Sequence, residues 1–514
     1  MTYFIVIMTI ILVIFSIPLT TIFVKHKKIP EESFLRDRVL FRLPTGTHQL
    51  ALPTVRRAGD IAAAGIFISS LGHIAVLALV FLGVARHGKI QGPLIFRHKH
   101  RGQIEGEGVL RQIVKLGSPF QSLSLIHISS TVKQKDLGEY LVKEMQAMGI
   151  KDAEMDENGY VYGSIPATPG YEKAPKIGFL AHMDTVADVP ACENPRIVEK
   201  YDGSDVVLNE EHNVVMRMAD FPSLKQLVGD DIIVTNGLTL LGADDKAGIA
   251  EILTAAEHLL NDPSIPHGEV KIAFTPDEEI GRGPDHFDIK RFGADFAYTI
   301  DGALLGGVEY ENFNAASSEV TVNGQSVHPG SAKNQMKNAN YIAMEYNSLL
   351  PQEQKPEYTE GYEGFYFLHG MEGSVEKATL HYMLRDHDAK KFEEKKTMMD
   401  KVAAFINEKY GAGTVTVKTT DMYRNMREKI EPQIHLVHAV MDAMRQLGVE
   451  PVVSPIRGGT DGSKITYMGT PCPNFCTGGT NFHGRFETVS IQAMDKIVEL
   501  IEKILTNYAE QSKK

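Results

Sequence analysis

The sequence predicts an α/β protein with a smaller α+β domain inserted into it and a hydrophobic extension at its N-terminus. Three observations predict this organisation. From about residue 130 to 311, short apolar runs alternate with amphipathic helical segments, which is typical of a largely parallel sheet. From about 312 to 421 the order becomes β-α-β-β-α-β, the order of a split βαβ or ferredoxin-like unit. Two long apolar stretches lie within the first hundred residues.

The composition fits a multidomain globular protein. The chain has 514 residues, 43% of them hydrophobic, and a net charge of -12 from 65 acidic and 53 basic residues. This length is too great for a single core, and the acidic balance argues against a general nucleic-acid binder. The cysteines are too few for a disulfide framework and fit a reducing compartment; they are Cys192, Cys472 and Cys476. We therefore expect the catalytic part to be cytoplasmic.

The first 105 residues form the hydrophobic extension. Phe4–Val24 carries no charge, and Ile61–Ala85 contains only one titratable side chain, His73. Both stretches are long enough to be candidate transmembrane helices, so membrane anchoring is one expectation. Basic residues flank both stretches and give no single orientation. We hypothesise that residues up to about 125 include sequence fused to the rest, which one intact, transcribed reading frame at the locus would contradict.

Hydrophobic periodicity defines the elements of the first catalytic segment, residues 126–311. Lys135–Met148 places its apolar residues on one helical face, and Asp245–Asp262 is a clear amphipathic helix. Lys176–Ala181 is a short apolar run that suits a buried parallel strand. Val270–Thr275 and Phe296–Ile300 also read as strands. This alternation predicts the parallel sheet.

The inserted domain, residues 312–421, and the second catalytic segment, residues 422–514, follow. The expected strands of the insertion are Glu319–Val322, Gly364–Leu368, Lys377–Leu384 and Thr414–Thr419, and its expected helices are Asn338–Leu350 and Ala389–Tyr410. Two further helices are expected near Gln433–Gln446 and Ser490–Asn507. They return the chain to the catalytic domain.

Clusters of acidic or imidazole side chains follow the predicted strands, where ligands bind in open α/β sheets. They are His182 with Asp184, Asp244 with Asp245, Glu278 with Glu279, and Asp301, with His483 farther along. Each cluster alone has an ordinary explanation, such as an Asp that caps a helix N-terminus. Imidazole together with carboxylate suits zinc, and a carboxylate can bridge two ions. Together the clusters favour a metallohydrolase over a set of structural residues.

The chain resembles the M20 family of di-zinc peptidases and, within it, the tripeptide aminopeptidases. The matching strings are TLLGADDKAGIAEI (239–252), HGEVKIAFTPDEEIGRG (267–283), ENFNAAS (311–317), SVHPGSAK (326–333), NMREK (425–429), PIRGGTDGS (455–463), PCPNFCTGG (471–479) and NFHG (481–484). Their order and spacing agree from about residue 130 to the C-terminus. The first hundred residues have no counterpart in that family.

The resemblance implies a di-zinc catalytic domain with an inserted lid domain. It assigns one zinc to His182 and Asp301, the other to Glu279 and His483, and both to a bridging Asp244 with a cis peptide bond to Asp245. These five ligands would hold two zinc ions per subunit.

The resemblance also implies catalytic roles. Glu278 would be the general base that takes a proton from a metal-bridging water and passes it to the leaving amine. Asp184 would accept a hydrogen bond from the far nitrogen of His182 and fix its tautomer. His328, in the inserted domain, would reach an active site across a subunit interface or after closure. Without the resemblance, His328 is equally well a histidine in a turn.

Substrate contacts are the least defined part of the predicted site. Arg457 could pair with the C-terminal carboxylate of a peptide. Arg385 is a second candidate, with a strand-end salt bridge as the alternative. Asn314 is expected to hydrogen-bond the substrate backbone by analogy. Cys472 and Cys476 are expected to be structural thiols and not metal ligands.

The resulting prediction is a zinc-dependent tripeptide aminopeptidase that binds small peptides, binds no nucleic acid and is a candidate homodimer. The alternatives within the enzyme class are another M20-type dipeptidase and an N-acyl amino acid hydrolase. A membrane-anchored peptide-binding protein without turnover is the alternative from another class.

Overall fold

The computed structural model describes residues 40–42, 49–51, 132–190, 192 and 195–513. The chain divides into two compact units, 1–101 and 102–514. In the first unit, β1 (Leu40–Arg42) pairs antiparallel with β2 (Gln49–Ala51). Both candidate transmembrane stretches lie outside the described residues. Within the described part of the chain, no helix combines the length and the apolar character needed to cross a membrane.

A mixed eight-stranded sheet forms the centre of the catalytic domain, in the order β17-β12-β18-β11-β5-β10-β4-β3. Its four middle strands run parallel: β18 (Asn474–Cys476), β11 (Phe296–Gly302), β5 (Ile177–His182) and β10 (Val270–Thr275). The flanking strands are β4 (Val161–Ile165), β3 (Glu154–Met155), β12 (Gly307–Glu309) and β17 (Val452–Val453). Every residue of β5 is buried, as expected of a parallel strand covered on both faces.

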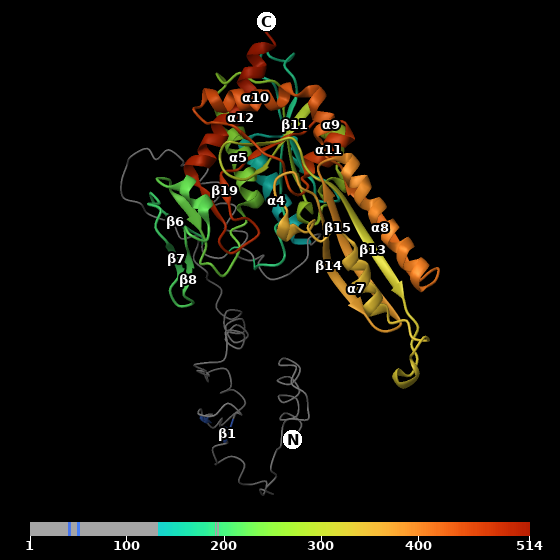
Figure 1. The fold of residues 1–514 in the computed structure, drawn as a ribbon. Coiled ribbons are helices and arrows are strands. Elements are labelled where there is room, and N and C mark those ends of the chain that lie inside the picture. The colour runs from blue at the N-terminus through green and yellow to red at the C-terminus, as the bar shows by residue number, and fades with distance from the viewer. Residues whose placement is uncertain (1–39, 43–48, 52–131, 191, 193–194, 514) are drawn as a thin grey trace, which may run out of the picture. The chain divides into compact units, whose positions relative to one another are not determined.

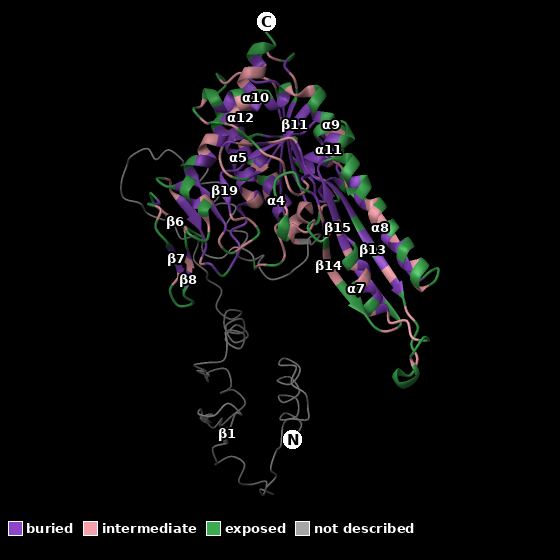
Figure 2. Cartoon of the chain, viewed as in Figure 1, coloured by how far each residue is buried: buried purple, intermediate pink, exposed green. Residues whose placement is uncertain are grey.

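Amphipathic helices cover this sheet (Figure 1). The long ones are α4 (Val132–Met148), α5 (Ala243–Asn261), α10 (His435–Gln446) and α12 (Ile491–Gln511). The short helices are α6 (Ile289–Phe292), α9 (Arg427–Ile430), α11 (Asp461–Met468), and the 3₁₀ turns η4 (Pro222–Leu227), η5 (Glu278–Ile280), η6 (Gly283–His286) and η9 (Glu431–Gln433). Buried residues concentrate around α5, α12 and β11 (Figure 2), which places the main core between these helices and the sheet.

A second, smaller sheet has the order β19-β20-β9-β6. Its strands are β19 (Gly479–Thr480), β20 (Thr488–Ser490), β9 (Ile232–Val234) and β6 (Arg196–Val198), and the hairpin β7 (Val206–Asn209) and β8 (Val214–Met216) lies between β6 and β9 in the sequence. β20 pairs antiparallel with β9, so Val489 faces Ile233. This pairing brings two distant parts of the chain to the start of α5.

The lid domain has the predicted β-α-β-β-α-β order. Its elements are β13 (Asn314–Asn323), η7 (Pro329–Ser331), α7 (Ala339–Leu349), η8 (Pro356–Tyr358), β14 (Phe365–Gly373), β15 (Lys377–Asp386), α8 (Ala389–Tyr410) and β16 (Val415–Tyr423). The strands form one antiparallel sheet, β14-β15-β13-β16. Helices α7 and α8 contribute to one hydrophobic core with this sheet. The predicted fold class is therefore confirmed for the catalytic and lid domains.

Candidate active site

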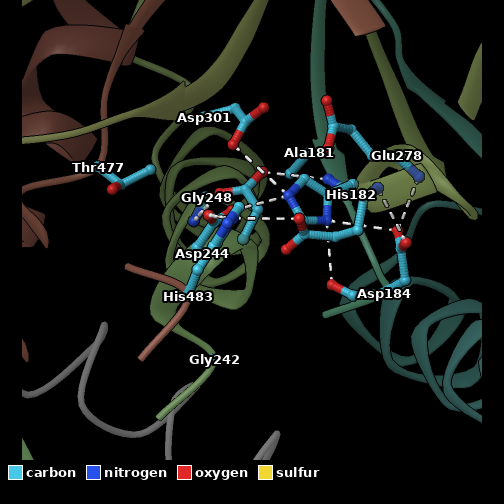
Figure 3. A network of polar contacts seen from close by, with 12 residues as sticks. Ala181, His182, Asp184, Gly242, Asp244, Gly248, Glu278, Asp301, Thr477 and His483 are labelled. Carbon is cyan, nitrogen blue, oxygen red and sulfur yellow. Dashed lines mark hydrogen bonds and ion pairs between the residues drawn. The ribbon is translucent and has the colours of Figure 1, made fainter. Parts of the chain in front are cut away.

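The parallel strands deliver the predicted metal ligands to one edge of the sheet (Figure 3). His182 is the last residue of β5, and Asp301 lies next to the end of β11. Glu279 lies in η5, just after β10, and Asp244 lies at the start of α5. Because neighbouring parallel strands end at the same edge, side chains distant in sequence converge there.

The first group consists of His182, Asp244 and Asp301. Nε2 of His182 lies 2.8 Å from Oδ1 of Asp244 and 3.5 Å from Oδ1 of Asp301. Nδ1 of the same ring lies 3.0 Å from the backbone carbonyl oxygen of Asp184. A carbonyl oxygen can only accept, so Nδ1 carries a proton and Nε2 faces the carboxylates.

The second group consists of Asp244, Glu279 and His483. Nε2 of His483 lies 3.0 Å from Oδ2 of Asp244 and 3.1 Å from Oε2 of Glu279. Asp244 thus belongs to both groups and presents one oxygen to each. The side chain of His483 is 55% exposed, so the site is accessible to solvent on this side.

Asp245 ties the start of α5 to the sheet. The peptide bond between Asp244 and Asp245 is cis, as the resemblance implies. The Asp245 carboxylate accepts hydrogen bonds from the backbone N–H groups of His182, at 3.1 Å, and Gly248, at 3.2 Å. A Cβ atom on Gly248 would lie 2.2 Å from the carbonyl oxygen of Ile300, so only glycine permits α5 to approach β11 this closely.

The electrostatics of the two groups fit divalent cations. Burial opposes a charge on His182, yet nearby carboxylates, Asp301 foremost, raise its pKa well above the ordinary value. Burial raises the pKa of Asp301 to about 6, while His182 acts in the opposite direction. Hydrogen bonds to Asp244 and Glu279 raise the pKa of His483 to about 10. The carboxylates therefore draw positive charge into a largely buried space, and imidazole with carboxylate suits zinc.

Glu278 precedes the candidate ligand Glu279 on η5. Burial raises the pKa of the Glu278 carboxyl well above the ordinary value, with Asp301 as the next cause. Its backbone N–H donates to Oδ1 of Asp184 at 3.0 Å, and that of Glu279 donates to Oδ2 at 3.1 Å. Figure 3 shows Asp184 and Glu278 on the opposite side of the His182 ring from Asp301.

Asp184 accepts from the far nitrogen of His182, as expected, through its backbone carbonyl. The nearer acceptor for Nδ1 of His182 is the Asp184 carbonyl, at 3.0 Å, and the carboxylate oxygen is at 3.4 Å. The carboxylate is aligned with the two N–H groups of η5, which an acid can cap. Asp184 therefore holds both the ring and the loop that carries Glu278.

Sequence analysis missed Glu487. Its buried carboxylate accepts three backbone hydrogen bonds, from Leu241 at 3.0 Å, Gly242 at 2.6 Å and Asp244 at 2.9 Å. It lies three residues beyond the matching string NFHG, next to β20. An isolated glutamate gives no periodic signal, so only the pairing of β20 with β9 shows its partners.

Two further polar pairs were also missed. Oδ1 of Asn474 accepts from the backbone N–H of Asp301 at 3.1 Å, and its Nδ2 donates to Glu309 at 2.7 Å. Asp461 accepts from the hydroxyl of Thr275 at 2.6 Å, and burial raises the Asp461 pKa to about 7. Asp461 and Asn474 lie inside the matching strings, but neither type of residue is distinctive alone.

His328 lies in an exposed loop after β13, where its Nδ1 accepts from the backbone N–H of Gly330 at 3.1 Å. β13 has ten residues from Asn314 to Asn323. At ~3.3 Å per residue, it carries the chain about 30 Å from the junction with the catalytic domain. Within one chain, the structure therefore does not bring His328 to the metal ligands.

Arg457 is engaged with the lid domain. Its Nη1 donates to the carbonyl oxygens of Gly361, at 2.7 Å, and Glu363, at 2.9 Å, and its Nη2 donates to the hydroxyl of Thr359 at 2.9 Å. The guanidinium also lies over the ring of Phe313, 5.2 Å from its centroid. In this conformation Arg457 ties the loop before α11 to the lid.

Arg385 is buried on β15, and its Nη1 donates to the carbonyl oxygen of Leu384 at 3.0 Å. Its guanidinium lies 5.5 Å from the ring centroid of Tyr423, and no ion pair to it is found among the described residues. The guanidinium of Arg385 therefore makes its described contacts with backbone carbonyls and with an aromatic ring. Cys472 and Cys476 are buried free thiols outside both ligand groups of the described chain.

The side-chain amide of Asn314 makes hydrogen bonds within the protein. Its Nδ2 donates to the carbonyl oxygens of Asp386 and His387, at 3.0 and 3.1 Å, and its Oδ1 accepts from the backbone N–H of Asn425 at 3.0 Å. The residue is 3% exposed. Asn314 thus joins the ends of the lid strands to the catalytic segment, and both N–H groups of its amide are used there.

Comparisons with known proteins agree with this fold. Residues 310–414 match the family model of the peptidase dimerisation domain, M20_dimer. Peptidase T of Alkaliphilus oremlandii is 52% identical over 382 residues, which cover 74% of this chain and 93% of that protein. Peptidase T of an Exiguobacterium species is 53% identical over 384 residues, with the same shares covered.

A solved structure of a tripeptidase from Staphylococcus aureus is similar with a TM-score of 0.64 and 22% identity, covering 80% of this chain and all of that one. A dinuclear metal-binding peptidase of the M20 family from Bacillus subtilis gives a TM-score of 0.52 at 14% identity, covering 78% and 99%. These two likenesses concern the fold.

The relatives at over 50% identity and the match to the dimerisation domain place the chain among hydrolases of the M20 peptidase class, and the two-domain fold fits this class. At the level of sequence the assignment is narrower: the chain belongs to the peptidase T family. The predicted family and the predicted class of enzyme, an aminopeptidase-type hydrolase, are thereby confirmed.

Proposed function

We propose that the chain is a zinc-dependent tripeptide aminopeptidase that removes the N-terminal residue of tripeptides. The observation that carries the proposal is the pair of ligand groups that share Asp244, with Glu278 beside them. Relatives of this chain are named peptidase T, and structural neighbours are described as a tripeptidase and as a dinuclear metal-binding peptidase. These descriptions support the substrate class and the number of ions.

The proposed ligands would bind two ions, one at each of the two groups that share Asp244. His182 and Asp301 would hold one, Glu279 and His483 the other, and Asp244 both. When bound, two such cations polarise a peptide carbonyl and lower the pKa of a water between them. The nitrogen and oxygen donors favour zinc among the common divalent metals.

The remaining chemistry belongs to the chain. Glu278 would accept the proton of the attacking water and deliver it to the leaving amine nitrogen. Asp184 holds the loop of Glu278 in place through two backbone hydrogen bonds. His328 of a second subunit, or of a closed lid, would donate to the developing oxyanion. Arg457 would give up its hydrogen bonds to the lid carbonyl oxygens and pair with the C-terminal carboxylate of the substrate. Arg385 would be a second binding group for the substrate.

We further propose that the enzyme is a cytoplasmic homodimer joined through its lid domains. The match to a dimerisation domain over residues 310–414 supports this assembly. Helix α7 exposes Tyr341 (71%) and Met344 (57%), and the edge strand β14 exposes Phe367 and Met371. An unpaired strand edge beside exposed apolar side chains is a suitable surface for a second copy.

The test is a substrate panel for the purified full-length chain with Zn²⁺. We expect release of the N-terminal amino acid from a tripeptide, and none from the same tripeptide acetylated at its N-terminus. Faster cleavage of a dipeptide or of an N-acyl amino acid would favour those alternative hydrolases. Binding of tripeptide without release of an amino acid would favour the peptide-binding alternative.

A further inference from the structure

We propose that Gln134 is a positioning residue for the carboxylate loop, defined as residues 277–282. The inference rests on the proposed roles of Glu278 and Glu279 in that loop. Nε2 of Gln134 donates to Oδ1 of Asp277 at 2.8 Å, and the backbone N–H of Asp277 donates to Oε1 of Gln134 at 3.2 Å. One amide group therefore engages both the side chain and the backbone of the residue that precedes Glu278.

Asp277 is the residue where the chain turns from β10 into η5. Its φ is 62°, in the left-handed region that Asp and Asn tolerate better than most residues. Although it is the N-cap residue of η5, its side chain makes no capping hydrogen bond. The N–H groups of Glu278 and Glu279 are bound by Asp184. The Asp277 side chain is thus available for Gln134.

Gln134 is attached to a rigid element. It lies in the first turn of α4, whose residues Leu137, Leu141 and Met145 are 2%, 0% and 0% exposed in the main core. A side chain held on a packed helix can fix a neighbouring loop, because the helix itself does not move with that loop.

The carboxylate loop has few other supports. Asp184 holds its middle through two N–H groups, and Nζ of Lys464 donates to the carbonyl oxygen of Gly281 near its end, at 2.7 Å. Gln134 alone, among the side chains for which the structure shows contacts, holds the side chain of Asp277 at its beginning. Loss of this support would let Glu278 and Glu279 shift, and small misplacements of reacting groups slow the chemical step.

The test uses a donor–acceptor swap in the full-length protein. In the parent, Gln134 donates to Asp277 and accepts from its backbone. Gln134→Glu sets two carboxylates against each other, whereas Q134E combined with D277N restores both hydrogen bonds, with the side-chain donor and acceptor exchanged. Gln134→Ala removes both hydrogen bonds. Gln146→Ala is the matched control, because Nε2 of Gln146 also makes one hydrogen bond from α4, to Ala153 at 2.9 Å, away from the loop.

We expect Q134A to lower kcat on a tripeptide about tenfold with KM changed less than about twofold, and Q134E to lower kcat about a hundredfold. The double variant Q134E/D277N should recover to within about threefold of the parent. Co²⁺ titration provides a readout independent of turnover. Q134A should lower the Co²⁺ affinity of the group with Glu279 about tenfold and leave the Co²⁺ affinity of the group with Asp301 unchanged.

Two results for the Gln134 variants would overturn the inference, and a third comes from the control variant. One is unchanged kcat and unchanged Co²⁺ affinities in Q134A; the other is a Q134E/D277N variant as impaired as Q134E. Equal losses in Q134A and Q146A would assign the effect to general helix stability and would also overturn it. If the parent cleaves no tripeptide, the proposed function fails, while the Co²⁺ titration still decides the role of Gln134.

Discussion

Oε1 of Glu487 accepts a hydrogen bond from the backbone N–H of Asp244 at 2.9 Å, while Oε2 binds the two residues before Ala243. The carboxylate that both ligand groups share is therefore positioned by a second carboxylate, 243 residues away in sequence. The position of Asp244 depends on a loop beside β20 as much as on its own helix.

Glu487→Ala should damage both ion sites together. Two buried N–H groups and one partly buried N–H group would lose their acceptor, which costs about 1–3 kcal/mol for each buried group left unsatisfied. We expect a melting temperature lower by several degrees and less than one Zn²⁺ retained per chain after dialysis, measured by calorimetry and elemental analysis. Glu499→Ala on the surface of α12 is the control, since Glu499 is half-exposed and pairs only with Lys496 in the contacts the structure shows. Two retained ions would contradict the assigned role.

Glu278→Ala should abolish turnover and leave the ions in place. The side chain belongs to neither ligand group, so its loss removes a proton acceptor without removing a ligand. We expect kcat to fall by at least about 10³-fold with unchanged zinc content. Substantial activity in this variant would refute Glu278 as the base.

Mixing two inactive variants should reveal whether His328 acts across subunits. His328→Ala and Glu278→Ala chains each lack one group, but a mixed dimer contains one site with both. We expect activity to appear on mixing and to approach one quarter of the parent value when the subunits exchange freely. A mixture that stays inactive, although sedimentation shows mixed dimers, would favour closure of the lid within one chain.

A pH-dependent contact links α5 and α12. Nδ1 of His258 lies 2.7 Å from Oε1 of Glu502, and this hydrogen bond raises the pKa of His258. A raised folded-state pKa gives stability that is fully present below the unfolded value of about 6.5, and that stability is lost as the pH rises through the raised pKa.

His258→Gln should therefore lower the melting temperature at pH 5.5 and leave it unchanged at pH 9. The side chain is 49% exposed, so solvent screening limits the difference to about 1–2 °C. Exposed His212, changed to Gln, is the control. An equal effect of His258→Gln at both pH values would contradict the charged contact.

Many of the candidate metal ligands at the edge of the sheet could be predicted, because the ends of the apolar strands can be recognised in the sequence. VKIAFT stops at Thr275, and three acidic residues follow after a single proline, so the place of Glu278 and Glu279 follows from the pattern. The same holds for His182 after β5. The long helix Ala389–Tyr410 has the bounds that its periodicity predicts.

The supports of the site could not be predicted in this way. Strands such as β9 and β20 have three residues each, too few for a periodic signal, and their pairing alone gives Glu487 its partners. Gln134 is a neutral side chain on an ordinary helix turn. The residue type of Asn314 suits a substrate contact, but the sequence does not show that both N–H groups of its amide bind carbonyl oxygens at the domain junction.

The separation of the ligands along the chain sets the moment at which the enzyme can become active during synthesis. Asp244 and His483 are 239 residues apart, and Glu487 follows His483 by four positions. A ribosome-bound chain can fold its lid and most of its central sheet before these residues emerge, yet it cannot complete the second ligand group. Peptide cleavage through the proposed ligands would therefore begin only after His483 and Glu487 have left the ribosome.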